Sequence, residues 1–183
     1  MTPARTTPAV TLTPLDTDDA ELLHGWLADP VAAHELGWWP RPLSALRERI
    51  ERDIADGDDD AFLVLRPDGE PVGLAELTGQ SLADGTAGVR ILTAPEHRGR
   101  GHGRAALDAL TDLAFGELPF HRLAARPHTG NAPALALLER AGFTREGVER
   151  AACRHRGRHY DLAVLSLLRP EWEALERPRA WEP

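Results

Sequence analysis

The sequence contains no lysine: all 21 of its basic residues are arginine, set against 29 Asp and Glu residues for a net charge of -8. This absence excludes a Walker A lysine on a phosphate, a Schiff base with pyridoxal phosphate, and the lysine of protein kinases. The acidic balance argues against a general nucleic-acid-binding protein. Several nucleotide-dependent and cofactor-dependent classes are therefore excluded before any motif is considered.

Cysteine and long apolar runs are also scarce. Cys153 is the single cysteine, so no internal disulfide can form. No apolar run approaches the roughly 18–20 residues of a membrane span, and the N-terminus lacks the apolar region of a signal peptide. With 183 residues, 42% of them hydrophobic, the chain has the size and composition of one packed domain. We expect a single cytoplasmic domain over residues 8–173, with tails at 1–7 and 174–183 and no membrane partner.

Hydrophobic periodicity and turn signals divide the chain into alternating helices and strands. Ser44 and Asn131 are predicted N-caps of helices, and Gly57 and Gly142 are predicted to end them. Strands are expected at 10–14, 61–66, 71–80, 86–93, 121–126, 144–150 and 158–167, and helices from about 16, 31, 44, 101 and 131, with a short helical turn after 169. This mixture predicts the α/β class.

The segment Arg98-Gly-Arg-Gly-His-Gly-Arg104 lies between a predicted strand and a predicted helix. Glycine lets the backbone approach a ligand closely, and the first N–H groups of a helix face outward with a dipole that favours anions. Three arginines in seven residues add donors that suit phosphate oxygens. The segment therefore predicts a site for a diphosphate.

A dinucleotide is one candidate ligand, because Gly101-x-Gly103-x-x-Ala106 matches the Rossmann fingerprint. However, a Rossmann loop follows its strand at once, whereas Pro95 and neighbouring residues intervene here. The acidic residue expected at the end of the next strand is replaced by Arg126. An NADP site and a simple glycine-rich turn stay open as alternatives on this segment alone.

A second motif, Asn131-x-x-Ala-x-x-x-Leu-Glu-Arg-x-Gly-Phe143, follows at a fitting distance. Together with Arg98, Gly101 and Gly103, which match the acyl-CoA pattern Arg/Gln-x-x-Gly-x-Gly/Ala, it makes the chain resemble the GNAT N-acetyltransferase superfamily. The resemblance covers roughly residues 8–173 and is strongest to the Rim-type branch, which contains ribosomal-protein N-terminal acetyltransferases and many small-molecule acetyltransferases.

The resemblance implies a mixed, strongly bent sheet of six to seven strands, flanked by about four helices and splayed after its fourth strand, 86–93. It also implies acetyl-CoA as cosubstrate. The backbone near the end of that strand would pair with the pantetheine amides, the 98–104 loop would hold the pyrophosphate, and two residues of the second motif would contact the pantetheine arm and the nucleotide end. These implied contacts are Ile91, Leu92, Thr93, Arg98, Gly99, Arg100, Gly101, His102, Gly103, Arg104, Asn131 and Arg140.

The activity implied is direct attack of a primary amine on the acetyl thioester, which requires removal of a proton because amines have a pKa near 10. The acceptor would be a small-molecule amine or a protein N-terminus, and the protein a monomer or homodimer. The candidate proton-transfer groups are Glu76, Glu35, His34 and Tyr160. Trp38 and Trp39 are expected to flank the acceptor mouth, with at least one packed into the core.

Some positions depart from the family pattern. Leu138 occupies the place where many members carry a tyrosine as general acid, and Ala134 the place of a serine found in some Rim-type enzymes. These departures motivate an alternative, a CoA-binding sensor whose catalytic site has decayed. No metal site is expected: His155 and His159 are interpreted as a surface pair on one strand face, without a ligand partner at a suitable spacing.

Overall fold

The computed structural model describes residues 8–35, 38, 41–57, 59–155 and 157–181, with only the backbone described for Val31 and Glu35. The helices are α1 (Ala20–Leu27), α2 (Pro30–Glu35), α3 (Leu43–Asp56), α4 (His102–Asp112), α5 (Ala132–Arg140) and α6 (Arg169–Glu173). The strands are β1 (Thr11–Pro14), β2 (Asp60–Leu65), β3 (Pro71–Ser81), β4 (Thr86–Thr93), β5 (Arg122–Ala125), β6 (Thr144–His155) and β7 (Arg158–Leu168).

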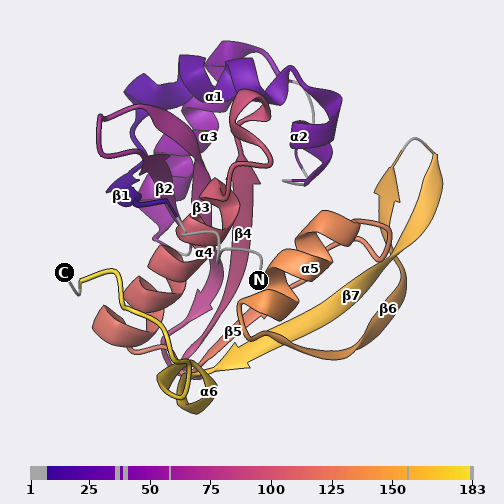
Figure 1. The fold of residues 1–183 in the computed structure, drawn as a ribbon. Coiled ribbons are helices and arrows are strands. Elements are labelled where there is room, and N and C mark those ends of the chain that lie inside the picture. Colours follow the sequence, from indigo (N-terminus) through magenta and orange to yellow (C-terminus); the bar gives the residue numbers. More distant parts are fainter. Residues whose placement is uncertain (1–7, 36–37, 39–40, 58, 156, 182–183) are drawn as a thin grey trace.

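The described strands form one mixed sheet in the order β1-β2-β3-β4-β5-β7-β6 (Figure 1). All neighbours are antiparallel except β4 and β5, which run parallel and pair over only three residues each, Thr86–Gly88 with 122–124. Beyond that point the two strands separate, so the sheet opens into a V. The predicted splay after the fourth strand, and the predicted GNAT-type mixed α/β fold, are confirmed.

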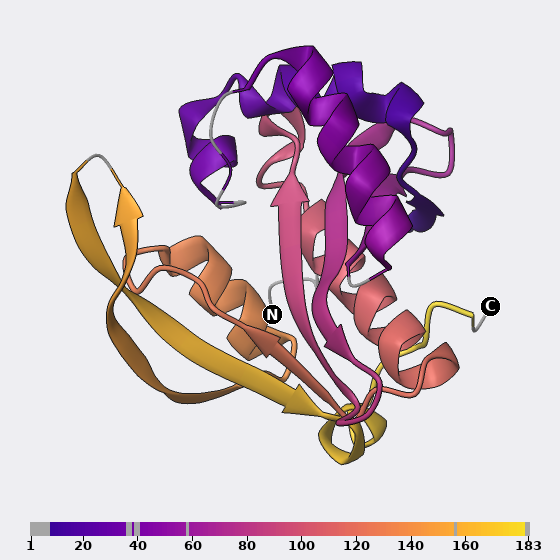
Figure 2. The ribbon, with the colours of Figure 1, turned by 180° about the vertical axis from the view of Figure 1, so that it is seen from behind.

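Side-chain alternation along the central strands builds two cores on opposite faces of the sheet. Leu74 and Leu92 point to the face covered by α1, α2 and α3, which is in front in Figure 2. Ala75, Leu77 and Val89 point to the face covered by α4, which is in front in Figure 1. The helices therefore sandwich β3 and β4 and fix the position of the free end of β4.

Most predicted elements are found within a few residues of their expected bounds, but two local predictions are wrong. Ser44 does not cap α3, because the helix begins at Leu43 and Pro42 takes the cap position. The strand predicted to end at Arg150 continues to His155, because two bulges let it stay paired with β7. Gly57, at the end of α3, has the left-handed conformation expected of a C-terminal glycine.

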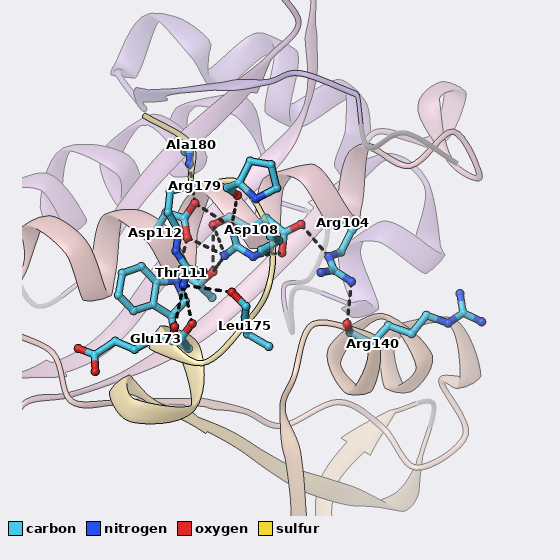
Figure 3. A network of polar contacts seen from close by, with 12 residues as sticks. Arg104, Asp108, Thr111, Asp112, Arg140, Glu173, Leu175, Arg179 and Ala180 are labelled. Carbon is cyan, nitrogen blue, oxygen red and sulfur yellow. Dashed lines mark hydrogen bonds and ion pairs between the residues drawn. The ribbon is translucent and has the colours of Figure 1, made fainter. Parts of the chain in front are cut away.

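The segment after α6, expected to be a tail, runs back along α4 up to Trp181 (Figure 3). The carboxylate of Asp112, which is only 1% exposed, accepts hydrogen bonds from Trp172 Nε1 at 2.8 Å and from the backbone N–H of Ala180 at 2.7 Å. It also pairs with Arg177, whose nearest nitrogen lies at 2.6 Å. These contacts fasten the C-terminal segment to α4.

Candidate functional site

The end of β4 presents an unpaired edge toward the opening of the V. Residues 73–78 of β3 pair with the opposite edge of β4 as far as Thr93, whereas the parallel pairing with β5 stops at Gly88. Within the described strands, the backbone from Val89 to Thr93 therefore has a row of polar groups available to an extended ligand. Ile91, Leu92 and Thr93, predicted to meet pantetheine, lie on this edge.

The loop after β4 leads directly into α4. Gly101 takes the N-cap position with φ of +94°, and the first intrahelical bond runs from the N–H of Ala105 to its carbonyl oxygen at 3.1 Å. A Cβ at Gly103 would lie 3.0 Å from Thr93 Oγ1, so glycine allows the first helical turn to lie against the end of β4. The helix N-terminus, with its outward N–H groups, thus sits beside the free strand edge.

The three loop arginines have different surroundings. Arg98 Nη1 contacts a carboxylate oxygen of Asp29 at 3.0 Å, which ties the loop to the junction between α1 and α2. Arg104 bonds to Asp108 at 2.7 Å and donates to the backbone carbonyl of Arg140 at 2.7 Å, which joins α4 to α5 (Figure 3). Arg100 is exposed. Arg98 and Arg100 are therefore both exposed, and Arg98 and Arg104 also hold neighbouring elements in place.

The other predicted CoA contacts are placed around the same opening. The His102 side chain is buried and lies edge-on to His97, so only its backbone can face a ligand at the helix terminus. The Asn131 side chain accepts the N–H of Ala134 at 3.2 Å, which confirms the predicted helix cap. Arg140 is exposed at the end of α5. Their contacts with acetyl-CoA stay predictions.

A strand edge that opens onto a glycine-rich helix terminus is the arrangement that the family resemblance implied, and comparison with known proteins supports the family. Residues 9–144 match the family model described as the acetyltransferase (GNAT) domain. The chain belongs to the GNAT acetyltransferase family. In line with its relatives, this GNAT protein is an N-acetyltransferase that transfers an acetyl group from acetyl-CoA to an amine.

Similar proteins share most of the GNAT chain's length. The chain is 27% identical over 138 residues to the spermidine N(1)-acetyltransferase of Vibrio cholerae, and this alignment covers 74% of the chain and 80% of that protein. The structure of a spermidine N-acetyltransferase from the same organism, in complex with CoA and spermine, superposes with a TM-score of 0.85 at 25% identity, over 90% of this chain and 98% of that one. A Bacillus subtilis protein named putative ribosomal N-acetyltransferase YdaF is 36% identical over 106 residues, 58% of each chain.

Glu76, the carboxylate predicted as a base, lies on β3 beneath α3. It is 5% exposed and pairs with Arg90 of the neighbouring strand, with 2.9 Å between Oε2 and Nε. Burial raises the pKa of the Glu76 carboxyl, and the guanidinium of Arg90 acts in the opposite direction. This ion pair gives Glu76 a structural role, and its catalytic role stays a prediction.

Of the two tryptophans predicted at the acceptor mouth, Trp38 is 8% exposed and packs in the core on the α1–α3 side. The guanidinium of Arg49 lies over its ring, 4.0 Å from the centroid. Trp38 therefore belongs to the core, as expected of at least one of the pair. Trp39 and the side chain of Glu35 lie outside the described residues.

His34 and Tyr160, the remaining candidates, lie in one cluster with residues that sequence reasoning did not select. The ring of His34, on α2, lies 4.4 Å from that of His128 and 3.7 Å from that of His155. The ring of Tyr160 lies 5.2 Å from that of His128. Sulfur of Cys153 lies 2.9 Å from Nε2 of His128. We call these five residues the imidazole cluster.

The imidazole cluster corrects the interpretation of His155 and His159 as a pair on one strand face. They lie on different strands, and His159 pairs in register with Arg154, so it faces the side opposite to His155. His159 is exposed, whereas His155 is half-buried against α2.

Across the part of the chain that the structure describes, no group of three His, Cys, Asp or Glu residues has the arrangement of a metal site, and no helix is long and apolar enough to cross a bilayer.

Proposed function

We propose that acetyl-CoA binds in the opening between β4 and β5, with its pyrophosphate at the 98–104 loop and its pantetheine arm along Ile91–Thr93. The free strand edge that ends beside the N-terminus of α4 is the observation that carries this proposal. Exposed Arg100 supplies a donor for phosphate oxygens, and Arg98, held by Asp29, supplies a second.

The acceptor amine enters, in this proposal, from the side where α2 approaches the β6–β7 hairpin. The α4 and α5 side of the opening is bridged by the contact between Arg104 and the carbonyl of Arg140, and we assign that side to the cosubstrate. The α2 side is lined by side chains that can exchange protons, His34 and Tyr160 among them. This places the amine and the thioester on opposite approaches to the same strand edge.

Transfer then proceeds by direct attack. The neutral amine adds to the thioester carbonyl, the C–N bond forms, the C–S bond breaks and CoA leaves as its thiolate. Backbone N–H groups near Leu92 and Thr93 are suited to stabilise the oxyanion of the tetrahedral intermediate. Because a thiol has a pKa near 8.5, the thiolate can leave without a strong proton donor, so the leucine at position 138 is compatible with turnover.

For the acceptor we propose a small-molecule primary amine. The structural similarity to the spermidine N-acetyltransferase of Vibrio cholerae extends over 98% of that chain, and the net charge of -8 favours the approach of a cationic amine. A protein N-terminus is the second candidate, supported by the 36% identity to YdaF. We place the activity in the cytoplasm, with a monomer or homodimer that requires neither nucleic acid nor a membrane.

The test is release of free thiol from acetyl-CoA, followed with a panel of amines that includes spermidine, spermine, aminoglycosides and peptides with free N-termini. Turnover of small amines with little on peptides supports the proposal, and the reverse preference supports the N-terminal acceptor. CoA binding by calorimetry without turnover of any amine would instead indicate the decayed sensor, which the comparisons do not support. Absence of CoA binding would contradict the placement of the cosubstrate.

A further inference from the structure

The imidazole cluster joins the two halves of the splayed sheet. His34 lies on α2, whose buried alanines pack with Leu92 on the β4 half. His128 follows β5 and forms an isolated bridge with Leu162 of β7, so it belongs to the other half. The ring contacts between them lie at the approach that we assign to the acceptor amine. Side chains from both walls of the opening therefore converge there.

The groups around His128 come from each element packed against it. The neighbour on α2 that the structure describes is His34, the neighbour on β6 is Cys153 and the neighbour on β7 is Tyr160. His155 of β6 lies next to His34 and Tyr160. Arg158 pairs in register with His155 and so shares its face. None of these groups is a carboxylate, so nothing among them favours a protonated imidazole at rest.

Burial lowers the pKa of His128, and the neighbouring His155 lowers it further. His128 is therefore neutral near pH 7 and has a lone pair for a proton. Burial also raises the pKa of the Cys153 thiol, which keeps the sulfur uncharged. Nε2 of His128 lies 2.9 Å from that sulfur, and in the tautomer that carries its hydrogen on Nε2 the lone pair lies on Nδ1.

We propose that His128 accepts the proton of the acceptor's ammonium ion, and that the rings of His34 and Tyr160, which contact its ring, hold it in place. This inference rests on the proposed acceptor side. The ammonium gives one proton to the imidazole, and the neutral amine attacks the thioester. The second proton leaves the new C–N nitrogen and ends on the CoA thiolate. Because burial lowers the pKa of His128, its imidazolium readily releases this proton to solvent.

Glu76 is less suited to this step, because Arg90 pairs with its carboxylate beneath α3. Sequence reasoning could not select His128, since it is one of eight histidines and its neighbours are far away along the chain. His34 precedes it by 94 residues and His155 follows it by 27 residues.

The test is the pH dependence of kcat/KM for His128→Gln, with the amine of the panel that the wild-type enzyme turns over. Loss of a general base typically costs about 100-fold or more, which we expect at pH 7. The wild-type profile should level off above the pKa of the imidazole. The variant should keep rising by about tenfold per pH unit toward the amine's pKa near 10, because it depends on amine that is already neutral in solution.

His159→Gln is the matched control, because His159 is exposed on the outer face of the same hairpin. It should leave both activity and profile unchanged, and CoA affinity by calorimetry should be equal in all variants. A His128→Gln profile parallel to wild type would overturn the inference. Absence of any wild-type turnover would instead count against the proposed function.

His155→Gln provides a second test if His128→Gln does not fold. Removing His155 takes away a neighbour that lowers the pKa of His128. The acidic limb of the kcat/KM profile of His155→Gln should therefore lie at higher pH than that of the wild-type enzyme. An unshifted limb in a folded, CoA-binding His155→Gln enzyme would refute the role of His128 as the titrating base.

Discussion

Replacing Asp112 by asparagine should detach the C-terminal segment from α4 and lower the free energy of unfolding. The Asp112 side chain is 1% exposed and that of Arg177 is 14% exposed, so the substitution leaves a largely buried guanidinium without its main partner. Breaking a buried pair by removing one member costs roughly 3–5 kcal/mol. Arg177 keeps Asp108 at 3.4 Å, which places the expected loss at the lower end, about 3 kcal/mol.

The assay is equilibrium unfolding in urea, with thermal unfolding beside it. The urea midpoint should fall with little change in slope, and a loss of about 3 kcal/mol corresponds to a Tm lower by about 6–12 °C for a domain of this size. Asp18→Asn is the control, since Asp18 is exposed and such changes stay within about 0.5 kcal/mol. Ending the chain at Ala174 should destabilise it similarly, because that removes both Arg177 and the N–H of Ala180.

A loss below about 1 kcal/mol for Asp112→Asn would refute the reasoning, because that is the range of an exposed ion pair. It would also indicate that residues 175–181 contribute little to the stability of the domain. CoA binding measured well below the Tm should be retained, because Arg104 keeps its contacts with Asp108 and with α5.

Three further outcomes are expected. Gly101→Ala should weaken CoA binding measured by calorimetry. The control is Gly57→Ala: Gly57 also has a positive φ, but no atom lies within 4 Å of the added Cβ, so the variant should lose only about 1 kcal/mol of stability and keep its CoA affinity. Equal CoA affinities of the two variants would contradict the role of the loop. Gly73→Ala would place a Cβ 2.2 Å from a carbonyl oxygen of β4 and should lower the free energy of unfolding in urea by roughly 1–3 kcal/mol. Gly25→Ala, at a helical position with no atom near the added Cβ, should instead raise it by about 1 kcal/mol. Hydrogen bonds from Arg122 and Ser166 lower the pKa of Glu146 to about 2, so its contribution to the free energy of unfolding is complete above the unfolded pKa of 4.5 and is lost as the pH falls toward about 2. The free energies of unfolding of Glu146→Gln and wild type, measured at low salt, should therefore converge as the pH falls through this window. A difference that stays constant with pH would count against this role of Glu146.

The elements of the sheet could be predicted because local chemistry marks their ends. A turn at Asp68-Gly69 separates β2 from β3, and Asn131 and Gly142 bound α5. The loop at 98–104 was recognisable because its glycines and arginines are adjacent in sequence. Features determined by a few neighbouring residues are those that sequence reasoning recovered.

Contacts between distant segments could not be predicted in the same way. The C-terminal segment has prolines and no periodic pattern, and its attachment depends on Asp112, more than 60 residues earlier. The imidazole cluster likewise depends on α2 approaching the hairpin across the open sheet. The face of Glu76 was ambiguous from its apolar neighbours, and only the packing of α3 over β3 places it beside Arg90. In each case the position is determined by tertiary packing.

The leucine at position 138 illustrates how the two kinds of information combine. Leu138 is buried in the core beneath α5, so it contributes packing where many family members carry a tyrosine. A missing acid is tolerable, because a thiol of pKa near 8.5 leaves as a thiolate near neutral pH. A missing base is not, because only about one amine in a thousand is neutral at pH 7. The chain can therefore dispense with a donor on α5, but it needs a proton acceptor on the acceptor side, where the neutral imidazole of His128 lies.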